Sequence, residues 1–418
     1  MAKEEKKAPK LRFNGYTNDW ERKEFGDVVE FYSGLTYKPE NIAQSGTLVI
    51  RSSNIHNSQY VNADNVYVKN NIVNSEYVKK QDIVVVVRNG SRNLIGKHAL
   101  LTSIPHNPSV IGAFMTGIRS SDNQFIETLL NTEQFKREIN KNLGATINQI
   151  TTSQFKKMRF HFSKQKENKQ IGVLFTYLDN SINLHERKCE ELALIKKALF
   201  QKLFPKKDEI KPEVRYKNFS DAWEQRKFSE ILAKSDGLRR GPFGSALKKE
   251  FFISSSEYTV YEQNNAIYNT WKTRYFITPE KFQELHKFQL VPGDFILSGA
   301  GTIGRIAQVP ANITKGVFNQ ALIRIRINPE WMDKNFFLIW MQSENMQRKL
   351  TQANPGSAMT NLVPMSEIKK WEIIIPSKAE QNKIGEFIQK LNSLITLHQR
   401  KLERLKQLKK FLLQNMFI

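Results

Sequence analysis

The segment INLHERKCEEL at Ile182–Leu192 returns as ITLHQRKLERL at Ile395–Leu405, with seven of its eleven residues identical. In both copies apolar residues recur at intervals of three and four, with charged residues between them. This period is typical of an α-helix with one apolar face. A chain that carries such a helix twice is expected to consist of two similar halves.

The repetition extends beyond the helices. DWERKEFGDVVEF at Asp19–Phe31 returns as AWEQRKFSEILAK at Ala222–Lys234, and ENKQIG at Glu167–Gly172 returns as EQNKIG at Glu380–Gly385. The sequence therefore predicts a globular part followed by a helix, and then a second globular part followed by a second helix. The predicted segments are a first globular domain at 13–163, a first helix at 164–205, a linker at 206–218, a second globular domain at 219–376 and a second helix at 377–418.

The apolar seams of the two predicted helices match position for position. The first consists of Ile171, Leu174, Leu178, Ile182, His185, Cys189, Leu192, Ile195, Leu199 and Leu203, and the second of Ile384, Phe387, Leu391, Ile395, His398, Leu402, Leu405, Leu408, Leu412 and Met416. This repetition favours pairing of the helices as a coiled coil, and the alternative is that each packs only on its own domain. Because one helix leads to the second domain and the other returns, a pair would be antiparallel, with approximate two-fold symmetry.

Composition limits the possible partners of this chain. It has 418 residues, 40% of them hydrophobic, and a formal net charge of +23. Such a charge favours a polyanion, with nucleic acid the leading candidate and an anionic membrane surface the alternative. No apolar run approaches the ~20 residues that span a bilayer, and the purest, residues 83–87, predicts a buried strand. The N-terminal MAKEEKKAPK lacks a signal-peptide core and Cys189 is the only cysteine, so we expect a cytoplasmic protein.

A Gly-x-Gly-x-x-Gly spacing in GAGTIG, residues 299–304, raises the alternative of a dinucleotide site. That site needs a helix directly after the third glycine. Here residues 305–309 alternate like a strand and a proline follows. The matching segment of the first half, residues 82–101, keeps only the third glycine, as Gly96. We therefore expect two strands joined by a tight glycine turn.

No catalytic motif accompanies the repeat. The sequence has no Walker A run, no Asn/Asp-Pro-Pro-Tyr/Phe motif of adenine methyltransferases and no histidine spacing typical of zinc. Glu209 and Lys211 have a nuclease-like spacing, but the charged segment around them is typical of a solvated linker. His185 and His398 recur at matching points of the helices, where a structural role is favoured over a metal site.

Together these segments resemble the specificity subunit of a bacterial type I restriction–modification enzyme. Two unlike globular parts each open with a Trp-Glu-x-x-x-Phe segment, at Trp20–Phe25 and Trp223–Phe228, and the second contains the hairpin GDFILSG. Each part ends in Glu-x-x-x-Ile-Gly followed by a helix with Leu-His-x-Arg-Lys. The resemblance covers all but roughly the first dozen residues. One departure is VVVVRNGSRNLIG at Val84–Gly96, which carries an insertion relative to the family's usual turn.

The resemblance implies a mixed α/β (α+β) fold with two target recognition domains on two long antiparallel coiled-coil helices. It also implies recognition of a bipartite, asymmetric DNA site, and assembly with two methyltransferase subunits and two restriction subunits. S-adenosylmethionine, ATP and Mg belong to those partners. The chain itself is then a non-catalytic subunit without cofactor or metal.

Side chains able to bind base edges gather in corresponding loops of the two globular parts. Arg, Lys, Asn and Gln supply the paired donors and acceptors that distinguish bases in the major groove. The candidates are Arg51, Ser52, Ser53, Asn54, Arg88, Asn89, Arg92, Asn93 and Lys97 in the first part, and Arg239, Arg240, Gln263, Asn264, Asn265, Lys272, Arg274, Asn319 and Gln320 in the second. Which of them contact bases and which contact phosphates stays open.

The sequence thus predicts a DNA-binding subunit that directs partner enzymes to a split site. A stand-alone DNA- or RNA-binding regulator with a coiled-coil spacer is the alternative. A purely structural coiled-coil adaptor is a third possibility, but it would not need a net charge of +23.

Overall fold

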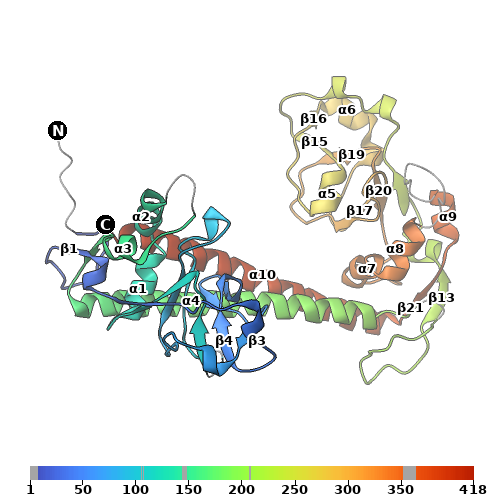
Figure 1. Cartoon of the computed structure of the whole chain (residues 1–418). Coiled ribbons are helices and arrows are strands. Elements are labelled where there is room, and N and C mark those ends of the chain that lie inside the picture. The colour runs from blue at the N-terminus through green and yellow to red at the C-terminus, as the bar shows by residue number, and fades with distance from the viewer. Residues whose placement is uncertain (1–7, 105, 107, 144–147, 207–208, 352–363) are drawn as a thin grey trace. The chain divides into compact units, whose positions relative to one another are not determined.

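The computed structural model describes residues 8–104, 106, 108–143, 148–206, 209–351 and 364–418. Its contacts divide the chain into a first unit, residues 1–187 with 399–418, and a second unit, residues 188–398. Each unit holds a mixed α/β head and part of both long helices, α4 (Gln165–Lys202) and α10 (Lys378–Asn415) (Figure 1). The predicted mixed fold with two long helices is confirmed. The domain boundaries stay predictions, because the division by contacts cuts through both helices.

The first head contains two four-stranded sheets. One has the order β2-β11-β8-β9 and is antiparallel, whereas the other, β10-β4-β7-β3, pairs β10 with β4 in parallel. The strands are β1 (Glu21–Glu24), β2 (Glu30–Ser33), β3 (Ile42–Ala43), β4 (Thr47–Ile50), β5 (Ile55–His56), β6 (Gln59–Tyr60), β7 (Val66–Val68), β8 (Ile83–Val86), β9 (His98–Leu100), β10 (Ser109–Ile111), β11 (Met115–Arg119) and β12 (Arg159–Phe162), and the helices are α1 (Asn123–Leu130), α2 (Glu133–Asn142) and α3 (Thr152–Lys156). The predicted buried strand is β8, all of whose side chains are shielded from solvent.

The second head repeats this plan with one strand fewer in the mixed sheet. Its sheets have the orders β14-β20-β17-β18 and β16-β15-β19, and β15 pairs with β19 in parallel. The elements are β13 (Glu224–Lys227), β14 (Leu238–Arg240), β15 (Tyr258–Tyr261), β16 (Phe276–Ile277), β17 (Phe295–Ser298), β18 (Ile306–Gln308), β19 (Gly316–Phe318), β20 (Leu322–Ile325) and β21 (Glu372–Ile375), with α5 (Gln263–Tyr268), α6 (Pro279–Glu284), α7 (Lys334–Met341), α8 (Glu344–Thr351) and α9 (Met365–Lys370).

The same buried ion pair fastens the start of each long helix. In the first unit Arg12 donates two hydrogen bonds, of 2.8 and 2.7 Å, to the carboxylate of Glu167. In the second unit Arg215 donates two, of 2.8 and 2.6 Å, to Glu380. Both carboxylates are only 1% exposed. A bidentate Arg–carboxylate pair fixes geometry as well as adding energy, so each helix begins at a defined angle to its head.

A phenylalanine near the end of each helix inserts into an aromatic core. Phe417, just beyond α10, lies 6.0 Å from Trp20 and 5.7 Å from Phe125 between ring centroids, all within the first unit. Phe204, just beyond α4, lies 6.4 Å from Trp223 and 6.0 Å from Phe336 within the second unit. Such aromatic contacts add to the free energy of burying the rings themselves.

Within the first unit, α4 and α10 run antiparallel and in contact. Asp179 accepts a 2.5 Å hydrogen bond from Lys409, and Glu186 forms a 2.6 Å ion pair with Lys406, so the numbering falls along α10 as it rises along α4. The seam is only partly buried, however, because Ile195, Phe387 and Leu408 are 49%, 39% and 44% exposed.

No helix in the described ranges is long and apolar enough to cross a membrane.

A buried acid distinguishes the first unit from the second. Glu127 on α1 lies 3.4 Å from Nε2 of His98, whose Nδ1 contacts the carbonyl oxygen of Gly96 at 2.8 Å. Burial raises the pKa of Glu127. At the equivalent places the second unit has Ile306 and Leu338.

We predict that Phe417→Ala destabilises the first unit and Phe204→Ala the second, each by about 3–5 kcal/mol, because each removes a ring from a packed core. Phe411, which is 54% exposed on α10, supplies the matched control, and its replacement by Ala should cost less than about 1 kcal/mol. Hydrogen exchange resolved to peptides of each unit measures the loss of protection. Equal loss in both units for Phe417→Ala would contradict this account.

We further predict a pH-dependent effect of Glu127→Gln. Because burial raises the pKa of Glu127, its contribution to stability is fully present below the unfolded value and is lost as pH rises through the folded value. His98, Lys409 and Asn131 oppose the rise, and Asp179 adds to it. The unfolding free energy of the variant minus that of the wild type should therefore increase from about pH 5 to about pH 8.

Glu133→Gln is the control for this pH series, because the side chain of Glu133 is 69% exposed and pairs with Lys136 one helical turn away. Its free-energy difference should stay small and nearly constant over the same range. A Glu127→Gln difference that did not change with pH would show that burial does not govern this acid.

Candidate nucleic-acid interface

The first head has an open groove of about 610 Å³ formed by three loops. These are residues 35–39 after β2, residues 51–53 after β4 and residues 112–114 between β10 and β11. Arg51, Ser52 and Ser53, three of the residues singled out in the sequence, lie on its wall. The guanidinium of Arg51 donates a hydrogen bond to the carbonyl oxygen of Asp64, which holds this loop against the next one.

The second predicted loop of the first head meets this wall. Asn89 donates a 3.3 Å hydrogen bond to the hydroxyl of Ser52, and Lys97 donates one of 3.0 Å to the Ser52 carbonyl oxygen. The guanidinium of Arg88 lies 5.0 Å from the centre of the Phe114 ring in a cation–π contact. The fold thus brings together two loops that are some forty residues apart in the sequence. Arg92 and Asn93 are exposed on the short turn between Asn89 and Lys97.

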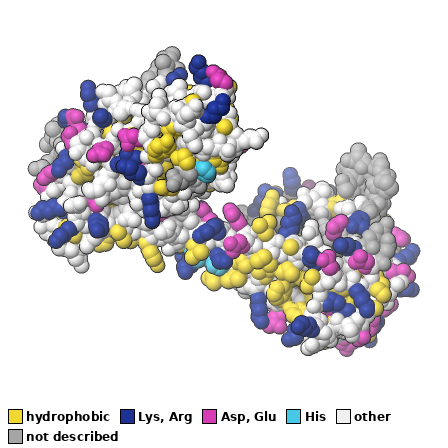
Figure 2. All heavy atoms as spheres, turned by 60° about the horizontal axis from the view of Figure 1, so that its bottom comes forward, with side chains coloured by type: hydrophobic (Ala, Val, Ile, Leu, Met, Phe, Trp, Pro, Cys, Tyr) yellow, Lys and Arg dark blue, Asp and Glu magenta, His cyan; other side chains and the backbone are white. Residues whose placement is uncertain are grey.

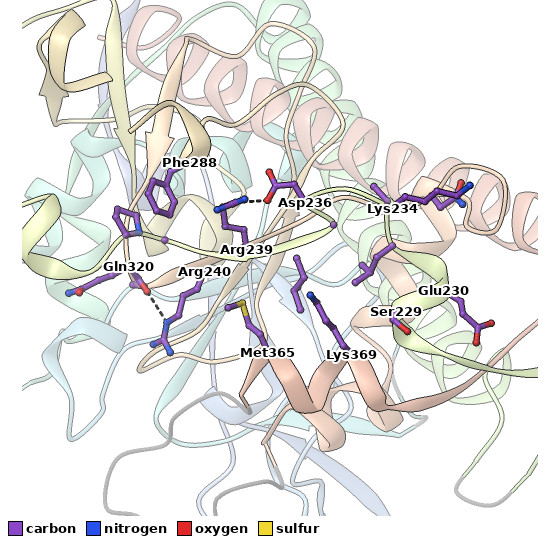
Figure 3. A pocket seen from close by; sticks show the side chains of 18 of the residues that line it. Ser229, Glu230, Lys234, Asp236, Arg239, Arg240, Phe288, Gln320, Met365 and Lys369 are labelled. Atoms are coloured by element: carbon purple, nitrogen blue, oxygen red, sulfur yellow. Dashed lines mark hydrogen bonds and ion pairs between the residues drawn. The ribbon is translucent and has the colours of Figure 1, made fainter. Parts of the chain in front are cut away.

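The second head has a larger groove of about 1280 Å³. Figure 3 shows Arg239, Arg240 and Gln320 on its wall, with the Arg240 guanidinium donating a 3.4 Å hydrogen bond to the Gln320 carbonyl oxygen. The Arg239 guanidinium contacts the carboxylate of Asp236 and lies 5.9 Å from the Phe288 ring centre. These three predicted residues therefore share one surface.

One carboxylate beside this groove forms ion pairs with three arginines. Asp236 forms ion pairs with Arg239, with Arg326 at 3.2 Å and with Arg324, whose side chain is 1% exposed. Burial lowers the pKa of Arg324. Arg326 has a second partner in Asp294, at 2.7 Å. With more guanidinium groups than carboxylates, this part of the second head carries positive charge beside the groove.

The glycine segment is a hairpin turn, as predicted. β17 pairs antiparallel with β18 across it, and Gly301 and Gly304 have φ values of 64° and 83° that glycine adopts without strain. Gln263 donates hydrogen bonds to the carbonyl oxygens of Ala300 and, at 3.2 Å, Thr302. Ala300 in turn lines the groove, so Gln263 holds the turn in place there. No helix follows the glycines, and the dinucleotide alternative is excluded.

The remaining candidates of the second head lie around the groove without lining it. Asn264 is exposed on α5, and the carbonyl of Asn319 packs beneath the adjacent loop. Lys272 is exposed, and Arg274 forms a 3.0 Å ion pair with Glu262. The structure therefore groups Arg239, Arg240, Gln263 and Gln320 more closely than Lys272 and Arg274.

Two of the candidate residues are buried in the protein. Asn54 is 0% exposed, accepts a hydrogen bond from the Arg51 amide at 2.9 Å and donates to the Ala63 carbonyl at 2.6 Å. Asn265 is 3% exposed and has the same arrangement with the Glu262 amide and the Thr270 carbonyl. Both amides are used to shape the loop, and we leave both residues out of the proposed interface.

Sequence reasoning missed several side chains of the two grooves. The first groove includes Tyr37 and Phe114, and the second includes Lys234, Lys369 and Phe243. Lys369 belongs to α9, which the sequence analysis did not connect with base recognition. Only Phe243 had a usable signal, because a phenylalanine between glycines in GPFG has few neighbours to pack against. Among the residues that the structure describes, no group of three or more His, Cys, Asp or Glu could hold a metal ion.

The two grooves share two equivalent loops, because residues 35–36 match 242–243 and residues 113–114 match 320–321. Gly34, after β2, packs so closely on Gly112 that an added Cβ would lie 2.0 Å from its carbonyl oxygen. Gly241, after β14, does the same with Asn319, at 1.9 Å. The loops that follow these glycines line the two grooves. One backbone frame thus presents two different sets of side chains.

Comparison with known proteins agrees with this architecture. The family model of the type I restriction modification DNA specificity domain matches residues 17–194 and 221–407. The chain belongs to this family, whose members are the non-catalytic DNA specificity subunits of type I restriction–modification systems.

Individual relatives are distant but match over most of their length. The specificity subunit of the type I restriction enzyme EcoKI from Escherichia coli (strain K12) is 23% identical over 87% of this chain and 80% of that protein. That of StySPI from Salmonella potsdam is 22% identical over 89% of this chain and 82% of that protein. The crystal structure of the S subunit of a type I system from M. genitalium has a TM-score of 0.61 at 15% identity, covering 98% of this chain and 99% of that one.

We predict that Asn54→Ala and Asn265→Ala each destabilise their own head by about 1–3 kcal/mol, because each leaves buried backbone groups without a partner. Asn264→Ala, at the exposed neighbouring position, should change stability by less than about 0.5 kcal/mol. Thermal unfolding of the purified variants measures both effects. If Asn54→Ala kept full stability but altered DNA specificity, Asn54 would belong to the DNA interface.

Proposed function

We propose that this chain recognises a bipartite, asymmetric DNA site, with each groove binding one half. The supporting observation is the pair of grooves, which share two equivalent loops and differ in the side chains that those loops carry. A symmetric protein surface would select a symmetric site, whereas two different surfaces select two different halves. We assign base contacts to Arg51, Ser52, Arg88, Asn89, Arg240 and Gln320, and supporting or phosphate contacts to Arg92, Asn93, Lys97, Arg239, Gln263, Asn264, Lys272, Arg274 and Asn319.

Charge supports DNA as the ligand. The net charge of +23 provides many sites for phosphate contacts, which dominate affinity for duplex DNA. Figure 2 shows Lys and Arg side chains spread over the drawn face of both units, with patches of apolar side chains between them. Since DNA is the proposed ligand, we place the protein in the cytoplasm.

We further propose that the chain assembles with two methyltransferase subunits and two restriction subunits, which bring S-adenosylmethionine, ATP and Mg. Exposed leucines support two equivalent docking surfaces on the helices. Leu184 on α4 and Leu397 on α10 occupy matching positions of the repeat and are 48% and 61% exposed. Ile195 and Leu408 form a second matching pair, 49% and 44% exposed. A surface that occurs twice suits two copies of one partner.

The proposal is tested with one arginine from each groove. Arg51→Ala should relax base specificity in the half-site read by the first head, and Arg240→Ala in the other half-site, each by about 1–3 kcal/mol if a bidentate base contact is lost. Modified adenines are mapped in cells that express the complex, and binding is measured on duplexes with each half randomised separately. Arg159→Ala is the matched control, because Arg159 is an exposed arginine that pairs with Glu24 and does not line the first groove.

Three results would count against the proposal. If both variants weakened binding equally on every DNA sequence, the two arginines would be phosphate contacts. Sequence-specific DNA or RNA binding by a chain that purifies without a methyltransferase would favour the alternative of a stand-alone regulator. Absence of DNA binding by the assembled complex would overturn the proposal altogether.

A further inference from the structure

Phe243 is the most exposed large apolar side chain among the described residues, at 87%. It lines the second groove, in the loop that joins β14 to the next short turn. Single exposed apolar residues are common on protein surfaces. This one stands out because its neighbours on the groove wall are Arg240 and Gln320, side chains of the kind that bind base edges.

The loop holds the backbone of Phe243 in a fixed position. On one side Gly241 packs against the Asn319 carbonyl and its amide donates a 3.0 Å hydrogen bond to Leu322. Pro242 is buried. On the other side the carbonyl of Phe243 accepts a 2.9 Å hydrogen bond from the Ala246 amide. The backbone is therefore anchored on both sides of a side chain that has almost no protein contacts of its own.

The first groove carries an exposed phenyl ring at a different place. Counting from the equivalent Gly34 and Gly241, the residue that matches Phe243 is Thr36, which is also exposed. Phe114 in the first groove is 54% exposed, and its match in the second groove is Ala321. Among the residues that line each groove, one phenylalanine is exposed, and the two exposed rings are carried on non-equivalent loops. A ring needed for the fold would be expected at the same place in both heads.

We propose that Phe243 is a specificity-determining residue whose ring packs against the 5-methyl group of a thymine in the half-site of the second head. This inference rests on the proposed function. A phenyl ring can neither donate nor accept a conventional hydrogen bond, and the thymine methyl is the apolar group that base pairs present in the major groove. Because the backbone on both sides of the ring is already anchored, binding does not have to order this loop.

The proposal specifies which DNA change the protein detects. Uracil differs from thymine only by the missing 5-methyl group, and its base pair with adenine is otherwise the same. Replacing the contacted thymine by uracil should weaken binding by the wild-type complex about three- to tenfold, the effect of losing one buried methyl contact. Uracil at thymines of the half read by the first head should leave the Phe243 contact unchanged.

The experiment uses the full chain in the complex with which it purifies, on duplexes of the mapped site with one thymine replaced at a time. We expect Phe243→Ala to bind the thymine duplex about as weakly as the wild type binds the uracil duplex, and to show no further loss with uracil. Phe243→Leu should keep part of the discrimination, because leucine retains apolar surface. Thermal unfolding should be unchanged in both variants, since the ring is exposed.

Phe114→Ala is the matched control, because it removes the exposed ring of the other groove and should leave the uracil effect in the second half intact. The inference is overturned if Phe243→Ala binds as the wild type does, or if it weakens binding while no thymine position is sensitive to uracil. Arg240→Ala in the same assay separates the two proposals. If Arg240→Ala relaxes base specificity in the second half-site while Phe243→Ala leaves binding unchanged, the proposed function stands and only the thymine contact is wrong.

Discussion

The burial of one phenylalanine near the end of each long helix is the interaction on which the rest of the structure depends. Phe417 and Phe204 each complete a core that already holds a tryptophan and a phenylalanine. Because α4 begins in the first unit and ends in the second, and α10 does the reverse, each unit is completed by the end of the helix that begins in the other unit. A domain boundary drawn at a helix end would therefore remove part of a core.

The buried ion pairs Arg12–Glu167 and Arg215–Glu380 fix the orientation of each long helix against its head. Ion pairs of this kind contribute little net stability, since removing charges from water costs about as much as their attraction returns. Their value lies in geometry, because a bidentate pair between the segment before the head and the first turn of the helix sets the angle of one to the other. Apolar packing alone would permit sliding, whereas paired hydrogen bonds do not.

The two heads share the backbone contacts that shape their loops and differ in the side chains that the loops carry. The close glycine contacts at Gly34 and Gly241 are the same in both heads and lie at the start of groove loops, and the buried amides of Asn54 and Asn265 shape a second pair of matching loops. The side chains above them differ, from Thr36 and Phe114 in one head to Phe243 and Ala321 in the other. A shared frame with changed side chains is a physical basis for selecting two different half-sites without changing the fold.

The sequence by itself determined the duplication, the two long helices, the hairpin in place of a nucleotide site and the basic character of the protein. These properties are local or periodic, and the repeat of Ile182–Leu192 at Ile395–Leu405 displays them directly. It also placed Asn89, Lys97 and Ser52 in loops that do meet.

Only the tertiary structure decided which of the candidate side chains are free to meet a ligand. Asn54 has the side chain of a base-binding residue, yet its amide bonds its own loop, whereas Phe114 follows a buried strand in the sequence and is 54% exposed. Exposure depends on contacts between residues far apart in the chain, such as Gly241 with Asn319, and no local pattern records which distant backbone will approach.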